Sequence, residues 1–266
     1  MMTTLALLAT LELASGQAGN LNLTGAHLTY GVLGPKRADN KLLPGDSLVV
    51  AFSIDGISSD EQGKVLYSIS TEVVDASNKT VHRQPPLDLE AVHALGGSKL
   101  PAYAQVDIGL KQPPGEYTLK VLVGDRANRK SATLTQKFTV LPPGFGLVRL
   151  ATSANAEGTL PSGLLGAGQT TWISALVVGF GRDNASKQPN VALQLRILDE
   201  SGKPTTAKGF STTINKDVPA DAPFLPIQFQ MALNRPGKFT LELKATDQTT
   251  NKSVTQLLPL TVHPNN

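Results

Sequence analysis

The chain contains one hairpin pattern twice, and this repeat limits the fold more than any other feature. Residues 113–142 read Pro-Pro-Gly-Glu-Tyr-Thr-Leu-Lys-Val-Leu-Val-Gly-Asp, then a short polar turn, then Lys-Ser-Ala-Thr-Leu-Thr-Gln-Lys-Phe-Thr-Val-Leu-Pro. Residues 235–264 repeat this pattern, so that Gly115 corresponds to Gly237 and Asp125 to Asp247, both 122 positions later. Solenoid repeats are about 20 to 50 residues long, so this longer period indicates a duplicated domain.

Each copy predicts a β-hairpin. Pro-Gly opens the first strand, because Pro fixes φ and Gly accepts positive φ. Apolar and polar residues then alternate, which places the apolar set on one face of a strand, toward a core. An Asp ends this strand, and Pro142 or Pro264, which has no N–H for a ladder, ends the return strand. The inward set is expected to be Tyr117, Leu119, Val121 and Val123 in the first copy, and Phe239, Leu241, Leu243 and Ala245 in the second.

The rest of each copy predicts further strands separated by turns. Apolar or alternating runs occur at residues 21–30, 48–54, 65–74 and 106–110, and again at 147–151, 171–178, 191–198 and 227–233. Only residues 89–95, between Pro86 and Gly96, suggest one or two helical turns, because Gly often closes a helix. Many short strands with almost no helix predict an all-β fold of two tandem antiparallel immunoglobulin-like β-sandwiches, with about seven strands each.

The repeat also predicts the domain boundaries. Residues 20–142 form the first predicted immunoglobulin-like β-sandwich module, and residues 147–266 form the second. The bridge between them, residues 141–146, is rich in proline rather than in glycine and serine, so it is expected to be semi-rigid. We therefore expect the two modules to keep a fixed mutual orientation.

Residues 1–19 precede the first predicted strand and are similar to a secretory signal peptide. An apolar run at residues 5–14 is followed by the small residues Ser15 and Gly16, as in such a signal. Glu12 interrupts the run and no Lys or Arg precedes it, so an ordinary first strand is the alternative. The signal-peptide interpretation predicts export to the periplasm, the cell surface or the extracellular space. No run is long enough to cross a bilayer, so no transmembrane segment is expected.

Composition excludes several classes of function. The 266 residues are 40% hydrophobic and 17% charged, which is typical of a globular chain. The net charge is only +3, and no run of Lys and Arg is interleaved with aromatic residues, so no nucleic-acid partner is predicted. Cysteine is absent, which excludes disulfides, thiolate metal sites and a cysteine nucleophile.

No catalytic, cofactor-binding or metal-binding residues can be nominated from motifs, and no cofactor is predicted. The histidines, His27, His82, His93 and His263, do not have the spacing of metal ligands. No serine lies in a nucleophile elbow, and no glycine-rich run has the spacing of a phosphate loop. Four Asp residues end predicted strands, and their turns raise the question of calcium, but hairpin-turn hydrogen bonding explains them better. These are Asp75, Asp125, Asp199 and Asp247.

Aromatic residues test whether the chain binds carbohydrate, which needs exposed flat rings. Trp172 lies in a dense apolar run and is expected in a core, as are Tyr67, Tyr117, Phe138 and Phe239. The looser candidates do not cluster in the sequence; they are Tyr30, Tyr103, Phe145, Phe210 and Phe224.

The two hairpin motifs resemble those of tandem immunoglobulin-like or fibronectin type III-like modules in exported, uncharacterised bacterial proteins. The motifs are Pro-Pro-Gly-Glu-Tyr-Thr-Leu-Lys-Val-Leu-Val-Gly-Asp-Arg and Arg-Pro-Gly-Lys-Phe-Thr-Leu-Glu-Leu-Lys-Ala-Thr-Asp, and the resemblance covers nearly everything after residue 20. It implies a non-catalytic structural or protein-binding module of the periplasm or cell envelope, with a protein or glycan partner. The alternatives are a carbohydrate-binding accessory module and an enzyme. The latter would need groups such as Arg149 and His93 to meet between the modules.

Overall fold

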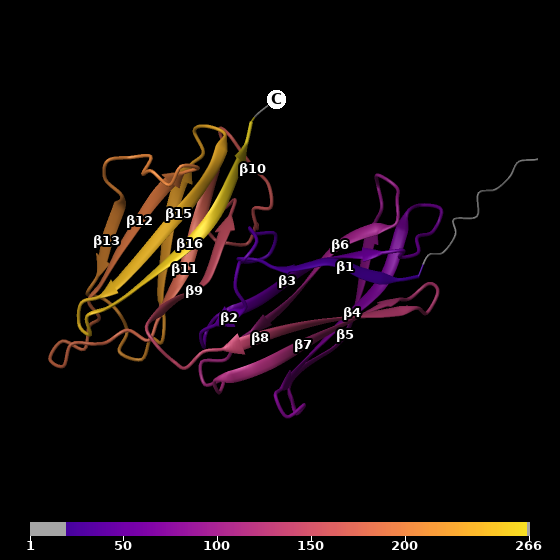
Figure 1. Cartoon of the computed structure of the whole chain (residues 1–266), viewed down its shortest axis with the longest axis horizontal. Coiled ribbons are helices and arrows are strands. Elements are labelled where there is room, and N and C mark those ends of the chain that lie inside the picture. Colours follow the sequence, from indigo (N-terminus) through magenta and orange to yellow (C-terminus); the bar gives the residue numbers. More distant parts are fainter. Residues whose placement is uncertain (1–19, 265–266) are drawn as a thin grey trace, which may run out of the picture.

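The computed structural model describes residues 20–264 and consists of strands and loops (Figure 1). The predicted signal peptide, residues 1–19, lies outside the described residues. The strands of the first half are β1 (Asn22–Leu28), β2 (Lys41–Leu42), β3 (Ser47–Asp55), β4 (Lys64–Asp75), β5 (Thr80–Val92), β6 (Lys99–Asp107), β7 (Gly115–Asp125) and β8 (Ser131–Val140). Those of the second half are β9 (Gly146–Ser153), β10 (Leu165–Gly166), β11 (Thr170–Val178), β12 (Val191–Asp199), β13 (Phe210–Ile214), β14 (Leu225–Ala232), β15 (Gly237–Asp247) and β16 (Lys252–His263).

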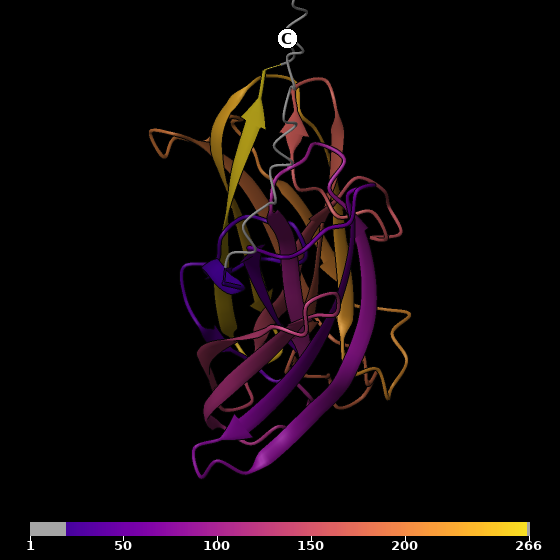
Figure 2. The same cartoon turned by 90° about the vertical axis from the view of Figure 1, so that its right-hand side faces the viewer.

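Both halves pair their strands in the same order. A three-stranded sheet, β1-β3-β6 or β9-β11-β14, accompanies a five-stranded sheet, β2-β8-β7-β4-β5 or β10-β16-β15-β12-β13. All pairings between neighbouring long strands are antiparallel, and only the two-residue strands β2 and β10 run parallel to β8 and β16. The predicted all-β fold class is therefore confirmed. In Figure 1 the two halves lie beside each other as separate sets of sheets, and in Figure 2 the first half lies in front of the second.

The repeated hairpins are confirmed down to their register. Gly115 pairs with Val140 on β7 and β8, and Gly237 pairs with Val262 on β15 and β16, the same alignment 122 residues apart. The predicted inward residues of β7 are all buried, and Leu119 and Leu241 are 0% and 1% exposed. Strands from both sheets contribute to each core, as expected of a β-sandwich.

The helical turns predicted at residues 89–95 are wrong. Most of this segment belongs to β5, a strand at the edge of its sheet that pairs only with β4. Pro85 and Pro86 are tolerated there because an edge strand leaves one row of N–H groups without ladder partners. The register shift between Ile69 and Thr71 lies opposite these prolines and absorbs their irregular geometry.

The core position predicted for Trp172 is also wrong. Along β11 the buried residues that alternate toward the core are Thr171, Ile173, Ala175 and Val177, and Trp172 lies on the opposite face, where it is half-buried. Val178, at the end of the strand, is also buried. Tyr30, which was expected to be a looser, more exposed aromatic residue, is 9% exposed. Its ring is buried in the hydrophobic core of the second half, although Tyr30 follows β1 of the first.

Among residues 20–264, no helix is long and apolar enough to span a membrane.

Candidate functional site

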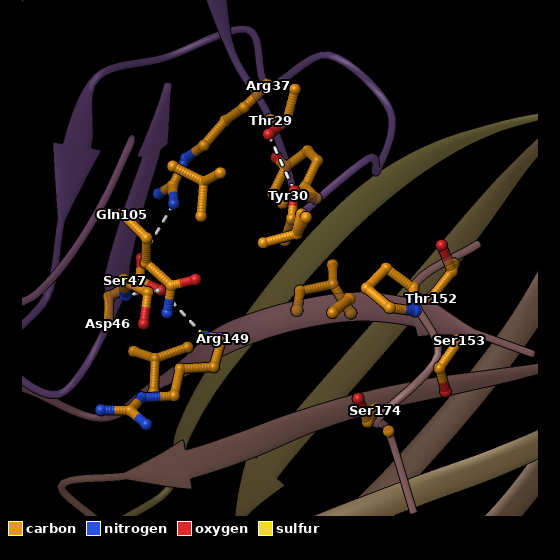
Figure 3. Close-up of a pocket in the computed structure, with 18 of the residues that line it drawn as sticks. Thr29, Tyr30, Arg37, Asp46, Ser47, Gln105, Arg149, Thr152, Ser153 and Ser174 are labelled. Carbon is orange, nitrogen blue, oxygen red and sulfur yellow. Dashed lines mark hydrogen bonds and ion pairs between the residues drawn. The ribbon is translucent and has the colours of Figure 1, made fainter. Parts of the chain in front are cut away.

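The two halves meet at a recess of about 230 Å³ that both of them line (Figure 3). The first half contributes the loop after β1, Asp46 in the turn before β3, the first residues of β3, and Gln105 of β6. The second half contributes β9, Ser174 of β11, and Gly158 and Pro161 from the loop after β9. Because this site exists only where the halves touch, its geometry depends on how they are held together.

Asp46 is the central residue of this contact. It ends the turn that launches β3 and is 4% exposed. One carboxylate oxygen, Oδ1, accepts the backbone N–H of Arg149 at 2.8 Å and that of Ser47 at 2.9 Å. The other, Oδ2, accepts Arg37 Nη1 at 2.9 Å. Asp46 thus joins the first half to β9 of the second through a buried, charge-assisted network.

Arg149 can reach Asp46 because β9 contains a bulge. The register of β9 against β11 shifts between Ser174 and Leu176, and Arg149 has a φ of +53°, which non-glycine residues seldom adopt. This turns its N–H toward Asp46, while its Nε donates to the carbonyl of Gly45 at 2.9 Å. The guanidinium also lies 3.4 Å from Asp107 of the first half. One residue of β9 therefore makes three polar contacts across the junction.

Tyr30 and Arg37 stack against each other beside Asp46 at the junction. The Arg37 guanidinium lies over the Tyr30 ring, 5.4 Å from its centre, a favourable cation–π arrangement. Burial raises the pKa of the Tyr30 hydroxyl above its ordinary value. Burial alone would lower the pKa of Arg37, but the neighbouring Asp46 and Asp39 carboxylates outweigh it and the pKa is raised. Both side chains thus keep their ordinary neutral and charged states.

Close backbone approach also holds the halves together. Gly45 has a φ of +94°, and a Cβ at this position would lie 3.1 Å from the Phe224 ring and 3.4 Å from Val178, both in the second half. A Cβ at Gly146 would overlap the side chain of Leu43. Glycine is needed at these positions because the facing chains leave no room for a side chain. The Pro-rich bridge is therefore supported by direct packing between the halves.

The recess does not assemble an evident catalytic group. Arg149 lines it, but His93 does not; His93 lies in the turn after β5, with both ring nitrogens buried and unpartnered among the described residues. The hydroxyl of Ser47 donates to Asp107 at 2.6 Å, and that of Ser153 donates to the carbonyl of Asn155 at 2.8 Å. Burial would raise the pKa of Asp107, but hydrogen bonds from Ser47 and Gln105 and the charge of Arg149 lower it.

The strand-ending Asp residues act as turn formers, as predicted. Asp125 and Asp247 are 1% and 0% exposed, and each accepts hydrogen bonds from its own turn and from the loop after β3 or β11. The donors outside the turn are Ser58 N at 2.8 Å and Gly181 N at 2.7 Å. Asp75 and Asp199 are half-buried at the start of exposed turns, and each accepts hydrogen bonds from the Ser and Lys that follow it in the turn. The pKa values of Asp75 and Asp199 are lowered mainly by hydrogen bonds from the hydroxyls of Ser77 and Ser201.

The remaining candidate residues lie apart. His27 bonds to the carbonyl of Gly25, His82 lies on β5, and His263 ends β16. Within residues 20–264 no group of three or more His, Asp or Glu side chains is placed to hold a metal. Two aromatic residues are strongly exposed, Tyr103 on β6 and Phe210 on β13. They belong to different sheets in different halves, so they do not form a common platform for a sugar.

The junction was not identified from the sequence, although one signal for it exists. Since Gly45 corresponds to Gly168, the position of Asp46 is occupied by Gln169 in the second half. The side-chain oxygen of Gln169 accepts the backbone N–H of Gly166 within its own turn. When a charged residue is present in one copy of a repeat and absent from the other, it is not needed for the fold that the copies share. Such a residue indicates a contact that only one copy makes.

Comparison with known proteins identifies no family. No family model matches the chain, and no curated protein matches it. Similar solved structures include the C-terminal domain of the antigen I/II-family protein AspA of Streptococcus pyogenes, with 9% identity over 92% of this chain and 100% of that chain, at a TM-score of 0.31. The C-terminal domain of the antigen I/II polypeptide BspA of Streptococcus agalactiae has 10% identity over 91% and 99%, at a TM-score of 0.28. Elastase-activated Escherichia coli alpha-2-macroglobulin has 12% identity over 92% of this chain and 22% of that chain, at 0.31. TM-scores this low carry no argument about function.

Proposed function

We propose that the chain is a non-catalytic structural or protein-binding unit whose two sandwich modules, residues 20–142 and 147–266, are held at a fixed angle. The observation that carries this proposal is the buried network of Asp46. Its ion pair with Arg37 lies within the first half and holds the carboxylate in place, while Oδ1 accepts the backbone N–H of Arg149 across the junction. A hydrogen bond to a charged group contributes about 1.5 to 3 kcal/mol, and the contacts of Arg149 with Gly45 and Asp107 add to it. A unit of this kind presents surfaces from both modules in a constant relation to a partner.

The fixed angle is tested by measuring residual dipolar couplings and small-angle scattering of the full chain. We expect both modules of the wild type to share one alignment tensor and the Asp46→Ala variant to show two. Gln169→Ala is the matched control, because it changes the corresponding turn of the second module without touching the junction. Modules that reorient independently in the wild type would refute the proposal.

We further propose that the protein is exported to the periplasm, the cell surface or the extracellular space. The apolar run at residues 5–14 and the small residues after it support this proposal. Fractionation of the source cells, followed by sequencing of the N-terminus of the recovered protein, tests it. Recovery of the intact, uncleaved chain from the cytosol would contradict export and leave the fixed-angle proposal standing.

A further inference from the structure

A second recess lies on the other side of the loop that follows β1, and it has a different chemistry. It measures about 360 Å³ and is lined by residues 33–36 of the first module and by Thr152, Ser162, Gly163, Leu165 and the end of β16 in the second. We call it the junction groove. Like the Asp46 contact, it exists only when the two modules are docked. In Figure 1 the loop of the first module reaches toward β10 and β16 at this place.

Apolar side chains from both modules line part of the junction groove. They include Pro35 from the first module and Leu165, Pro259 and Leu260 from the second. At its rim, Leu33 is 58% exposed and Leu164, next to the lining residue Leu165, is 74% exposed. Leu33 lies close to Gly163, since a Cβ there would be 3.1 Å from the Cβ of Leu33. Exposed leucines gathered around a recess from two modules are typical of an interaction site.

The charge of the junction groove is positive. Lys36 from the first module and His263 from the second both line it, and no Asp or Glu does. Neither side chain forms an ion pair with another residue among those the structure describes. Elsewhere at the junction, Arg37 and Arg149 are paired with carboxylates. The Lys36 ammonium is therefore available to an external anion, and a ring N–H of His263 can donate a hydrogen bond to it.

One buried polar atom in the groove lacks a partner. Thr152 is 3% exposed, and its hydroxyl forms no hydrogen bond within the described chain. Figure 3 shows this hydroxyl pointing away from Ser153 and Ser174, the serines of the first recess. Because this hydroxyl is enclosed by the chain and Thr152 lines both recesses, it belongs to the wall between them and is not a contact point for a ligand.

The groove also follows an open strand edge. On its outer edge β16 pairs with β10 only at Val262 and His263, so the preceding residues of β16, including Leu260, have no strand hydrogen-bonded to them on that side. An extended peptide placed there would continue the line of β10. Strand addition of this kind provides main-chain affinity, while alternating side chains provide specificity.

We propose that the junction groove binds an extended peptide that carries a carboxylate next to bulky apolar side chains. The apolar side chains pack against Leu33, Pro35 and Pro259, and the carboxylate lies between Lys36 and His263. This inference rests on the proposed protein-binding function and names the chemistry of the partner. It extends that function because the modules must be docked for the groove to exist.

The test titrates the full chain with two peptides, acetyl-Leu-Asp-Leu-Asp-Leu-amide and its neutral isostere acetyl-Leu-Asn-Leu-Asn-Leu-amide. Binding is measured by calorimetry and located by amide chemical shifts. We expect the acidic peptide to bind roughly tenfold more tightly than the neutral one, with shifts confined to residues 33–36, 162–165 and 259–263. Laurate serves as a third probe, because a fatty acid offers a carboxylate and an apolar body without a peptide backbone.

Matched variants separate the groove from general charge and hydrophobicity. Lys36→Glu should weaken the acidic peptide about tenfold or more, and Lys41→Glu, an exposed lysine outside the groove, should change it less than about twofold. Leu33→Asn should also weaken binding, because it removes an apolar wall while Asn tolerates the φ of +58° at this position. Leu160→Asn is its control, since Leu160 is equally exposed at 58% but does not line the groove.

Several results would overturn the proposal. These are equal affinity for the acidic and neutral peptides, no binding of either at about 1 mM, stronger binding of laurate than of the acidic peptide, or shifts that map to another surface. The alignment-tensor measurement on the Asp46 variant is independent of any peptide. A failed titration with rigid modules therefore rejects the groove and leaves the fixed-angle unit intact.

Discussion

Replacing Asp247 tests whether the buried strand-ending carboxylates hold the sandwiches together. Asp247 is 0% exposed and accepts four hydrogen bonds: from Gly181 N at 2.7 Å, Thr249 N at 2.9 Å, Thr250 N at 3.4 Å and Thr250 Oγ1 at 2.7 Å. Three of these are short. Hydrogen bonds to a charged group contribute about 1.5 to 3 kcal/mol each.

The expected loss is smaller than the sum of these bonds. The desolvation cost of the buried carboxylate cancels part of the free energy of its hydrogen bonds. In the variant, water can also hydrogen-bond to some of the turn N–H groups that the side chain leaves free. The Gly181 N–H comes from the loop after β11, outside the Asp247 turn, and is the donor for which a replacement acceptor is hardest to find. We therefore expect Asp247→Ala to lower the free energy of unfolding of the second module by about 3 to 4 kcal/mol.

Urea unfolding measures this loss, and the chain contains a suitable probe. Trp172 is the only tryptophan and lies on β11 of the second module, so its fluorescence reports that module directly. With a slope of about 2 kcal/mol per molar urea, the midpoint should fall by about 1.5 to 2 M. Asp199→Ala is the control, because its hydrogen bonds of similar length lie in an exposed turn, where water can replace them and the expected loss is much smaller. Equal losses for the two variants would refute the reasoning that burial makes the difference.

Three further results are expected. Burial would raise the pKa of Asp247, but hydrogen bonds led by that of Gly181 N outweigh it and the pKa is lowered. The stabilisation by this carboxylate is therefore complete at neutral pH and is lost as the pH falls below about 4. The urea midpoint reported by Trp172 should drop in acid, and an unchanged midpoint at pH 3 would contradict this. Tyr30→Ala should loosen the modules in scattering and lower the unfolding free energy by about 3 kcal/mol, because its ring fills the second core; Tyr103→Ala, at 48% exposure, should do neither. Leu119→Ala and Leu241→Ala occupy equivalent buried positions, so each should cost about 2 to 5 kcal/mol in denaturant titrations of its own module, and a large cost for one with none for the other would argue against equivalent cores.

Local patterns were reliable wherever a residue's environment depends on its near neighbours along the chain. The alternation of β7 and β15 places one set of side chains on each face, and two antiparallel strands joined by a short turn bring that set together in a fixed register. The turns around Asp75 and Asp199 were predicted for the same reason, because each side chain bonds to the backbone two to four residues ahead.

Two predictions failed because a distant segment decided the outcome. Residues 89–95 contain good helix formers, but β4 offers a complete row of partners and draws most of them into β5. Along β11 both faces carry apolar residues, Trp172, Leu176 and Val178 on one and Ile173, Ala175 and Val177 on the other. The face with Val178 meets Gly45 of the first module rather than the core, so Trp172 lies outside.

The amino-acid sequence by itself determined the strand content, the duplication and the hairpin registers of this protein, since these follow from periodicity and turn chemistry over short distances. Only the tertiary structure decided what lies between the modules. Asp46, Arg37 and Arg149 have no common motif, and Tyr30 belongs to one half by sequence and to the other by packing. Contacts between residues about 100 positions apart depend on how two complete sandwiches dock, and neither copy of the repeat contains that information.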